Sequence, residues 1–326
     1  MYRPTPVRAA ARGAALIPTS SKGPEGVARV HAVVVSWNGA QLLPSCLRPL
    51  LPQAGRVIVV DNGSSDDTDA LLRRDFPQVE VLRLRDNVGF GRANNEAMKR
   101  ALDEGAEFIA LVNNDVEVEP GWALALLDAA RAHPEAAFFC GTLLFKGEER
   151  VNSTGLVIDS FGRARDRDFG LPRAALSRSD GLVAGVSGGA ALLRGSALRQ
   201  IGLFDPAYFA YYEDVELSLR AARRGFRCWY ARDAVARHRF GATAGAGSAR
   251  QRYLLGRGHL RTVALHQPIL KAAALVPLTV AYRVAVKAPL ELLRRRPALA
   301  WAELRAAAGG ALTALQAFSD RSRRPR

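Results

Sequence analysis

The chain has few cysteines, histidines and methionines. Its 326 residues include three cysteines, five histidines and two methionines. The cysteines, Cys46, Cys140 and Cys228, lie far apart and form no C-x-x-C pair, which excludes a zinc ribbon and a thioredoxin-like redox motif. A small, odd number of cysteines is typical of a protein kept in a reducing cytosol rather than of a disulfide scaffold.

The chain also lacks a long uninterrupted apolar run. Its N-terminal segment carries Arg3, Arg8 and Arg12 but no apolar stretch of signal-peptide length. In the C-terminal part the longest uncharged stretches are residues 272–282 and 306–319. Both are shorter than the ~20 residues that span a bilayer. We therefore expect a cytoplasmic protein with neither a signal peptide nor a transmembrane helix.

Acidic residues are scarce in the last quarter of the chain. Residues 251–326 hold 14 Lys and Arg against 3 Asp and Glu, a net charge of +11. The whole chain holds 46 against 31, so residues 1–250 hold 32 against 28, or only +4. Nucleic-acid-binding proteins more often carry positive charge on the folded body, so we expect no nucleic-acid partner. A basic tail mixed with Leu, Ala and Trp favours peripheral binding to an anionic membrane.

Alternating apolar and polar segments predict an α/β domain. Apolar, often β-branched runs predict buried strands at residues 30–36, 57–60, 79–84, 108–112 and 136–145. Helical patterns lie between them: one capped by Ser64 or Ser65 and ending near residue 75, one over 89–104, and one from Pro120 to residue 132. This order predicts a mostly parallel sheet with flanking helices.

Composition divides the chain into three regions. Residues 1–28 are rich in Arg, Pro, Gly and Ser and are interpreted as a flexible leader. Residues 29–253 hold the α/β pattern, with a polar loop region over 146–181, a helix over 213–224 and a short strand over 235–238. Residues 254–326 show a helical pattern broken by prolines, which predicts a basic amphipathic helical extension.

Polar residues cluster where the predicted strands end. The clusters are Ser36-Trp37-Asn38, Asp61-Asn62, Asp86-Asn87 and the segment from Asn113 to Glu117. In open parallel sheets, ligands bind outside the carboxyl ends of the strands. The clusters therefore predict a ligand site at this edge of the sheet.

Three acidic or imidazole groups are candidates for a metal site. Asp115 and Glu117 are two residues apart on a chain expected to be extended, so their carboxylates point the same way. Mg²⁺ and Mn²⁺ prefer oxygen ligands and often bridge to phosphates. His238, which follows a short strand, would add a nitrogen ligand. A solvated turn and a packed histidine would explain the same residues without any metal.

Glu213 and Asp214 open a predicted helix directly after Tyr211 and Tyr212. A carboxylate partly desolvated by aromatic rings is a candidate general base. Ordinary helix capping also favours acids at this position.

Two further motifs are weaker. Residues 89–94 read G-x-G-x-x-N, a near miss of the dinucleotide fingerprint that follows the third predicted strand instead of the first. Residues 185–189 read G-x-S-x-G, with Asp205 or Asp214 and then His238 following in hydrolase order, but no helix pattern follows Ser187 directly. Neither a dehydrogenase nor an esterase is favoured.

Seven segments in a fixed order resemble family 2 glycosyltransferases, in particular the bacterial rhamnosyltransferase-like branch. They are VVVSWNG (33–39), VIVVDNGSSDDT (57–68), NVGFGRANNEAM (87–98), LVNNDVEVEPGW (111–122), GGAALLR (188–194), FDPAYFAYYEDVELSLRAARRG (204–225) and HRFGAT (238–243). The resemblance covers roughly residues 30–265. It implies a GT-A fold and inverting transfer of a sugar from a nucleotide-diphosphate sugar.

The resemblance also implies roles for individual residues. The residues implied to bind the nucleotide-sugar donor are Ser36, Asn38, Asp61, Asn87, Gly89, Arg92 and Asn114. The implied metal-binding acid is Asp115 of the D-x-D element, with His238 as a later ligand. Asp214 is the implied base, and Glu213 is the next candidate. Glu117 departs from the family pattern, because the second acid is Glu instead of Asp.

The chemistry of these residue types agrees with the resemblance. A divalent cation, Mg²⁺ or Mn²⁺, can stabilise a diphosphate leaving group. One carboxylate can deprotonate the acceptor hydroxyl, and no covalent nucleophile is needed. The expected acceptor is a glycan or lipid-linked hydroxyl in cell-envelope polysaccharide synthesis. A metal-dependent nucleotidyltransferase and a non-catalytic sugar-nucleotide- or lipid-binding scaffold remain the alternatives.

Overall fold

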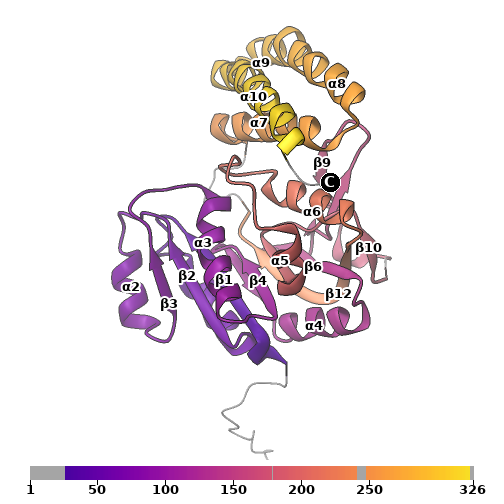
Figure 1. Ribbon diagram of the computed structural model, residues 1–326. Helices are drawn as coiled ribbons and strands as arrows, with labels where there is room; N and C mark the ends of the chain where they lie inside the picture. Colours follow the sequence, from indigo (N-terminus) through magenta and orange to yellow (C-terminus); the bar gives the residue numbers. More distant parts are fainter. Residues whose placement is uncertain (1–25, 178, 241–246, 324–326) are drawn as a thin grey trace, which may run out of the picture.

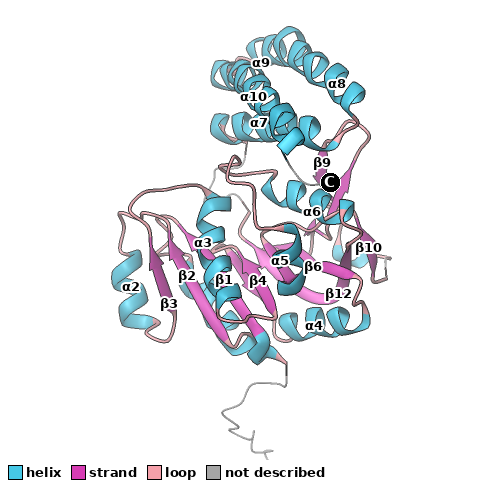
Figure 2. Cartoon of the chain, viewed as in Figure 1, coloured by secondary structure: helices cyan, strands magenta, loops and turns pink. Residues whose placement is uncertain are grey.

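The apolar runs of the N-terminal half form the centre of a sheet. The computed structural model describes residues 26–177, 179–240 and 247–323. In it, the strands β1 (Val30–Ser36), β2 (Arg56–Asp61), β3 (Glu80–Arg83) and β4 (Phe108–Val112) pair in parallel in the order β3-β2-β1-β4. The prediction of a mostly parallel α/β sheet is confirmed (Figures 1 and 2).

The second half of the sheet is mixed. β11 (Ala190–Arg194) runs antiparallel between β4 and β6 (Ala136–Phe145), and β12 (Arg227–His238) pairs with β6 in parallel. The remaining short strands are β5 (Val116–Val118) and β10 (Gly181–Val183) on β12, β7 (Val151–Ser153) on β6, and the separate hairpin β8 (Leu156–Ile158) and β9 (Ala164–Asp166).

Helices cover both faces of the sheet because successive strand residues point to opposite faces. Val34 packs with α1 (Leu43–Leu50), α2 (Thr68–Asp75) and α4 (Trp122–Ala132). Its neighbour Val33 packs on the other face with α3 (Phe90–Asp103), α5 (Gly195–Ile201) and α6 (Glu213–Arg223). The 3₁₀ turns are η1 (Val27–Arg29), η2 (Leu51–Gln53) and η3 (Arg173–Ala175).

Several predicted element boundaries were wrong. Ser64 and Ser65 do not cap α2, which begins at Thr68; they hydrogen-bond with Asn38 instead. Pro120 does not lie in the first turn of α4, which begins at Trp122. The region 146–181, expected to be a loop, holds β7, β8 and β9, whose three-residue strands are too short to show a sequence period. The strand expected over 235–238 is the end of the longer β12.

The C-terminal residues form a helical layer on the α/β domain (Figures 1 and 2). It consists of α7 (Ala249–His266), α8 (Ile269–Tyr282), the π-helical segment η4 (Arg283–Lys287), α9 (Ala288–Leu293) and α10 (Pro297–Arg323). The predicted boundary between residues 253 and 254 falls inside α7. Most of the predicted leader 1–28, and residues 241–243 of the HRFGAT segment, lie outside the described residues.

Buried ion pairs hold this helical layer together. Glu303 of α10 is fully buried and pairs with Arg252 of α7 at 3.1 Å, with Lys287 at 3.7 Å and with Arg283. A second pair joins α7 to the α/β domain, because Arg261 lies 2.9 Å from Asp205. Since removing one partner of a buried pair leaves an uncompensated charge, these contacts make the layer an integral part of the fold.

One stretch of this layer is long and apolar enough to cross a membrane. Residues Ile269–Leu293, which comprise α8, η4 and α9, meet the length and composition of a span, and only 17% of their most apolar window is buried. The expectation that no segment reaches these limits was based on uncharged runs alone. Lys271, Arg283 and Lys287 interrupt those runs without preventing a 25-residue helical stretch.

Candidate active site

A cleft of about 410 Å³ opens at the carboxyl edge of the parallel strands. Trp37 follows β1, Asn62 follows β2, and Asn113 follows β4. Gly188 precedes the antiparallel β11 and so lies at the same edge. The site therefore lies where the sheet topology predicts it.

Asp115 and His238 meet in this cleft although 123 positions separate them. β5 and β12 are antiparallel neighbours with His238 opposite Val116, so the end of β12 lies beside the turn that carries Asp115. The Oδ1 atom of Asp115 lies 3.2 Å from Nε2 of His238, and both side chains are largely buried. The other ring nitrogen, Nδ1, lies 2.9 Å from Oδ1 of Asn152. Asn152 thus fixes the ring so that Nε2 faces the carboxylate.

This pair fits one side of a divalent cation site. An oxygen and a nitrogen 3.2 Å apart can occupy neighbouring positions around an ion whose bonds are about 2.0–2.3 Å long. Within the described residues, no group of three or more His, Cys, Asp or Glu side chains is arranged to hold a metal. Asp115 and His238 would therefore hold such an ion only together with oxygens of a bound donor or water.

Glu117 lies apart from this pair. Its carboxylate is 2.6 Å from Nζ of Lys146, and it is not among the residues that line the cleft. The expectation that Asp115 and Glu117 point the same way assumed a continuous extended chain. Asp115 instead lies in a turn before β5, so strand alternation does not apply to it.

The two acids at the start of α6 also line the cleft. The preceding residues Tyr211 and Tyr212 both have positive φ, at 68° and 74°. Two successive non-glycine residues in this region are strained, and such strain concentrates at functional sites. The kink directs Glu213 and Asp214 to the cleft at the first turn of the helix.

Asp214 and Glu213 have different hydrogen-bond environments. Asp214 accepts hydrogen bonds from the backbone N–H groups of Gly188 at 2.9 Å and Val215 at 2.8 Å. The Oε2 atom of Glu213 is buried without a hydrogen-bond partner among the described residues. Burial raises the pKa of both acids, and the charge of Asp214 helps to raise the pKa of Glu213 to about 8. The two N–H donors oppose the effect of burial on the pKa of Asp214, whereas a pKa of about 8 leaves Glu213 protonated near neutral pH.

The predicted donor-binding residues fall into two groups. Asn87, Gly89 and Asn114 line the cleft. Gly89 has φ of +91°, and an added Cβ would collide with the carbonyl oxygen of Phe209, so the loop before α3 requires glycine.

The others lie behind or beside the cleft. Ser36 is fully buried and accepts a hydrogen bond from Asn114 at 3.1 Å. Asp61, also buried, accepts one from the backbone of Ser64. Asn38 binds the backbone of Ser65, and Arg92 donates to the carbonyl oxygen of Pro206. In these contacts the four side chains hold loops around the cleft.

The sequence analysis missed several polar residues of the cleft, among them Asn152, Arg165, Asp166 and Arg250. The first three belong to the region expected to be a loop, and Arg250 lies just before the predicted basic extension, near the end of the region 29–253. Burial raises the pKa of Asp166 to about 6. Ser187 also lines the cleft, but the ring nitrogens of His238 face Asn152 and Asp115, so the geometry does not favour an esterase triad.

The fold is the GT-A fold of glycosyltransferases. The sequence profile described as "Glycosyl transferase family 2" matches residues 32–202, and the chain belongs to this family. It is 30% identical over 202 residues to the N-acetylglucosaminyl-diphospho-decaprenol L-rhamnosyltransferase of two strains of Mycobacterium tuberculosis. That match covers 56% of this chain and 66% of the relative, slightly less than two thirds of its length.

Solved structures support the same fold. GalNAc-T7 with UDP, GalNAc and Mn²⁺ aligns with a TM-score of 0.59 and 14% identity, over 80% of this chain and 51% of that one. The mannosyltransferase PcManGT from Pyrobaculum calidifontis, in complex with GDP-Man and Mn²⁺, aligns with a TM-score of 0.52 and 16% identity, over 86% of both chains.

Proposed function

We propose that the protein transfers a sugar, with inversion, from a nucleotide-diphosphate sugar to a hydroxyl of a lipid-linked or glycan acceptor in cell-envelope synthesis. The observation that carries this proposal is the presence of two separate groups in one cleft. The buried acids of α6 are suited to proton transfer, and Asp115 with His238 is suited to hold a cation. Inverting transfer needs one group that accepts the proton of the acceptor and another that stabilises the leaving diphosphate, and it needs no covalent nucleophile.

In the proposed reaction the acceptor oxygen attacks the anomeric carbon of the donor sugar. The bond from that carbon to the diphosphate oxygen breaks, and the nucleoside diphosphate leaves. Asp214 takes the proton of the acceptor hydroxyl; its two backbone donors orient the carboxylate. A divalent cation held by Asp115 and His238 would offset the charge that develops on the leaving group.

The donor side of the cleft is proposed to involve Asn87, Gly89 and Asn114 directly. Ser36, Asn38, Asp61 and Arg92 are proposed to act through the loops that they hold. Glu117 is proposed to take no part in cation binding, because it faces Lys146 and lies outside the lining of the cleft. The mycobacterial relative, named for transfer of L-rhamnose, supports a deoxyhexose donor and an acceptor carried on a polyprenyl diphosphate.

Such an acceptor resides in a membrane, and we propose peripheral binding at the cytoplasmic face. The exposed apolar side chains of the C-terminal layer support this location. They include Leu270, which is 84% exposed, and Leu293, which is 82% exposed. Arg294, Arg295 and Arg296 follow directly and are exposed to contact anionic headgroups.

The test compares Asp214→Asn with Glu213→Gln. The donor is first identified by thermal shift with Mn²⁺ among UDP-, dTDP- and GDP-sugars, because a bound donor stabilises the fold. We expect Asp214→Asn to lower turnover by roughly 10²–10⁴ at unchanged donor affinity. Glu213→Gln keeps a neutral side chain where we assign a protonated acid, so its loss is expected to stay below about tenfold. Near-normal turnover of Asp214→Asn would end the assignment of the base.

A further inference from the structure

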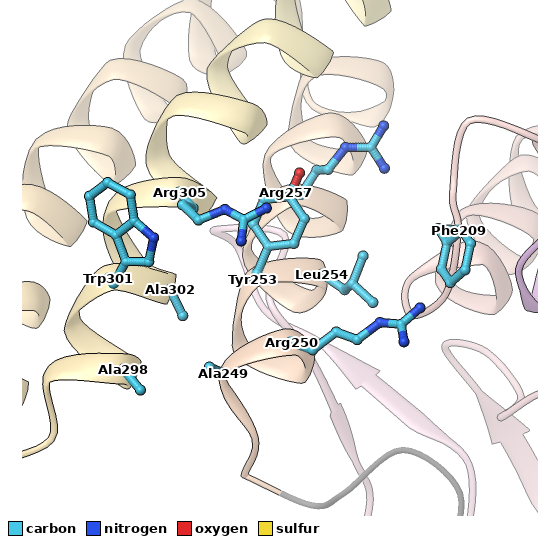
Figure 3. A pocket seen from close by; sticks show the side chains of 10 residues that line it. All are labelled: Phe209, Ala249, Arg250, Tyr253, Leu254, Arg257, Ala298, Trp301, Ala302 and Arg305. Atoms are coloured by element: carbon cyan, nitrogen blue, oxygen red, sulfur yellow. The ribbon is translucent and has the colours of Figure 1, made fainter.

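A second cavity, of about 510 Å³, lies between α7 and α10 (Figure 3). We call it the interhelix groove. Arg250, Tyr253 and Arg257 of α7 line one side, and Trp301 and Arg305 of α10 line the other. None of the ten residues that line it is acidic. The groove is therefore a positively charged site with aromatic walls.

The three arginines of the groove, Arg250 and Arg257 of α7 and Arg305 of α10, differ from the remaining arginines of α7 in their ion pairs. Arg252 and Arg261, on the same helix, are held by the carboxylates of Glu303 and Asp205. Within the part of the chain that the structure describes, no carboxylate lies within ion-pair distance of Arg250, Arg257 or Arg305. Without a carboxylate partner, each of these guanidinium groups can pair with an anion bound in the groove.

The groove is continuous with the catalytic cleft. Phe209, Arg250 and Leu254 line both cavities. The guanidinium group of Arg250 lies 5.2 Å from the centre of the Phe209 ring, at the junction between them. A single ligand can therefore reach from the groove to Asp214 in the cleft.

The other end of the groove is aromatic and open to solvent. In Figure 3, Trp301 lies at the end opposite Phe209. Its side chain is 62% exposed, which is unusual for tryptophan unless the ring meets a membrane interface or a partner. The guanidinium group of Arg305 lies 5.0 Å from the centre of the Tyr253 ring, so a cation and aromatic surface stand together beside it.

We propose that the interhelix groove binds the diphosphate of a polyprenyl-linked acceptor, with its first isoprene units against Trp301 and Tyr253. This inference rests on the proposed function and specifies its acceptor. Arginine pairs with phosphate oxygens through two parallel hydrogen bonds, which suits a diphosphate better than a single phosphate. The acceptor sugar then extends past Phe209 toward Asp214, and the chain leaves past Trp301 toward the membrane.

The test measures binding of farnesyl diphosphate, a short polyprenyl diphosphate, by calorimetry to the full-length protein without any donor. Arg305→Gln is the primary variant, because Arg305 contacts only the Tyr253 ring among its described partners. Arg257→Gln is the second; Arg257 also donates to the carbonyl oxygen of Ala207. Each is expected to weaken binding about tenfold or more, as for loss of a charged hydrogen bond. The control pair Arg48→Gln with Arg73→Gln, on exposed faces of α1 and α2, is expected to bind normally.

Two ligand controls separate the possible sources of the diphosphate. Inorganic pyrophosphate is expected to bind at least tenfold more weakly than farnesyl diphosphate, because it lacks apolar contact with Trp301. Equal affinity would overturn the assignment of a lipid. Nucleotide binding in the presence of Mn²⁺ is expected to be unchanged in Arg305→Gln, and loss of nucleotide affinity alone would assign the groove to the donor instead.

The result of the farnesyl diphosphate binding experiment does not depend on whether Asp214 is the base. Asp214→Asn is expected to bind farnesyl diphosphate like the wild type. If both arginine variants bind farnesyl diphosphate normally, the groove assignment fails while glycosyl transfer stands. If wild-type protein transfers no sugar but its farnesyl diphosphate binding depends on Arg305, the proposed function fails while the lipid-diphosphate site remains.

Discussion

Asp115 and His238 face each other across 3.2 Å, with Asn152 holding the far nitrogen of the ring. If Nδ1–H donates to the Asn152 oxygen, the lone pair of Nε2 points at a carboxylate. That lone pair and the carboxylate oxygen could then bind the same cation. The proposed shared ion is therefore best tested at these two residues.

We expect both ligand substitutions to weaken Mn²⁺-dependent nucleotide binding. Asp115→Ala should be the more severe, because it removes a charge that offsets the cation as well as a ligand. His238→Ala leaves a partial site, which added Mn²⁺ should rescue more readily than Mg²⁺, since imidazole suits softer ions better. Titration of nucleotide with each metal provides the measurement.

This experiment has a control variant and an outcome that would contradict the shared ion. Glu117→Gln should leave metal-dependent binding unchanged, because Glu117 faces Lys146 and lies outside the lining of the cleft. Equal metal dependence in wild type and Asp115→Ala would contradict the shared ion.

At the scale of single residues, the sequence pattern alone did not predict that Asp115 and His238 lie side by side. Asp115 could be located because it follows the apolar run of β4, and Asp214 because it opens a helix after tyrosines. Their meeting with His238 depends on β5 pairing with β12, which no local spacing reveals. Ligand chemistry and the family resemblance linked Asp115 with His238, but neither predicted this strand pairing. Arg250 and Asn152 carried no signal, since a lone polar residue outside any recognised motif matches any solvated surface.

At the scale of elements, the hairpin β8–β9 docks on α7 through a buried histidine. His259 is 4% exposed, and its Nε2 lies 3.1 Å from the carbonyl oxygen of Phe161 in the hairpin turn. Burial lowers the pKa of His259 to about 4, with Arg283 and Arg163 adding to this effect and Asp159 opposing it. The ring is therefore neutral at pH 7.

This lowered pKa predicts a pH-dependent loss of stability. The unfolded state, with a pKa near 6.5, binds a proton before the folded state does. The free energy of unfolding should therefore fall as the pH drops from about 6.5 to about 4, by roughly 3 kcal/mol, and then level off with respect to this group. Denaturant unfolding at a series of pH values measures the change.

The control variant is His259→Gln, which retains an N–H donor for Phe161 but cannot titrate. Its free energy of unfolding should therefore depend less steeply on pH between about 6.5 and 4. An unchanged dependence would rule out His259 as its source.

Elements with a strong period were predictable from the sequence, and short ones were not. The bounds predicted for β1, β4 and β6 agree with the structure, because five or more apolar residues fully covered by helices form a clear run. The strands β7, β8 and β9 have three residues each, and tertiary pairing rather than propensity decides them. Helix α4 begins after Gly121, whose φ of 85° no residue pattern specifies.

At the scale of the whole molecule, the basic C-terminal part is not a detachable tail. Leu265 of α7 packs with Ala314 and Ala317 of α10, and Glu303 of α10 is buried among three cations from α7 and η4. Deleting residues 269–326 would expose this apolar and charged interior. A deletion therefore cannot separate membrane binding from folding, and point substitutions on exposed positions are needed.

The exposed leucines of α8 and α9 provide those substitutions. Leu270, Leu278 and Leu293 are 84%, 63% and 82% exposed, so changing them to serine should leave the fold intact. If they enter the boundary of an anionic bilayer, each contributes up to about 1.5–3 kcal/mol of membrane affinity. The triple serine variant should therefore lose at least tenfold in affinity for phosphatidylglycerol vesicles, measured by flotation of the full-length protein. Nucleotide binding should stay at the wild-type level.

A matched control and an extraction step decide how the protein meets the membrane. Leu182→Ser changes a leucine of similar exposure, 55%, on β10 of the α/β domain and should leave flotation unchanged. Because arginines near a surface each add about 1 kcal/mol through screened attraction, binding of the wild type should weaken at high salt. Wild-type protein that stays unbound at low salt would refute membrane association. Protein that resists both high salt and alkaline carbonate would instead assign Ile269–Leu293 as a membrane span, because burial of a full apolar helix does not depend on headgroup charge.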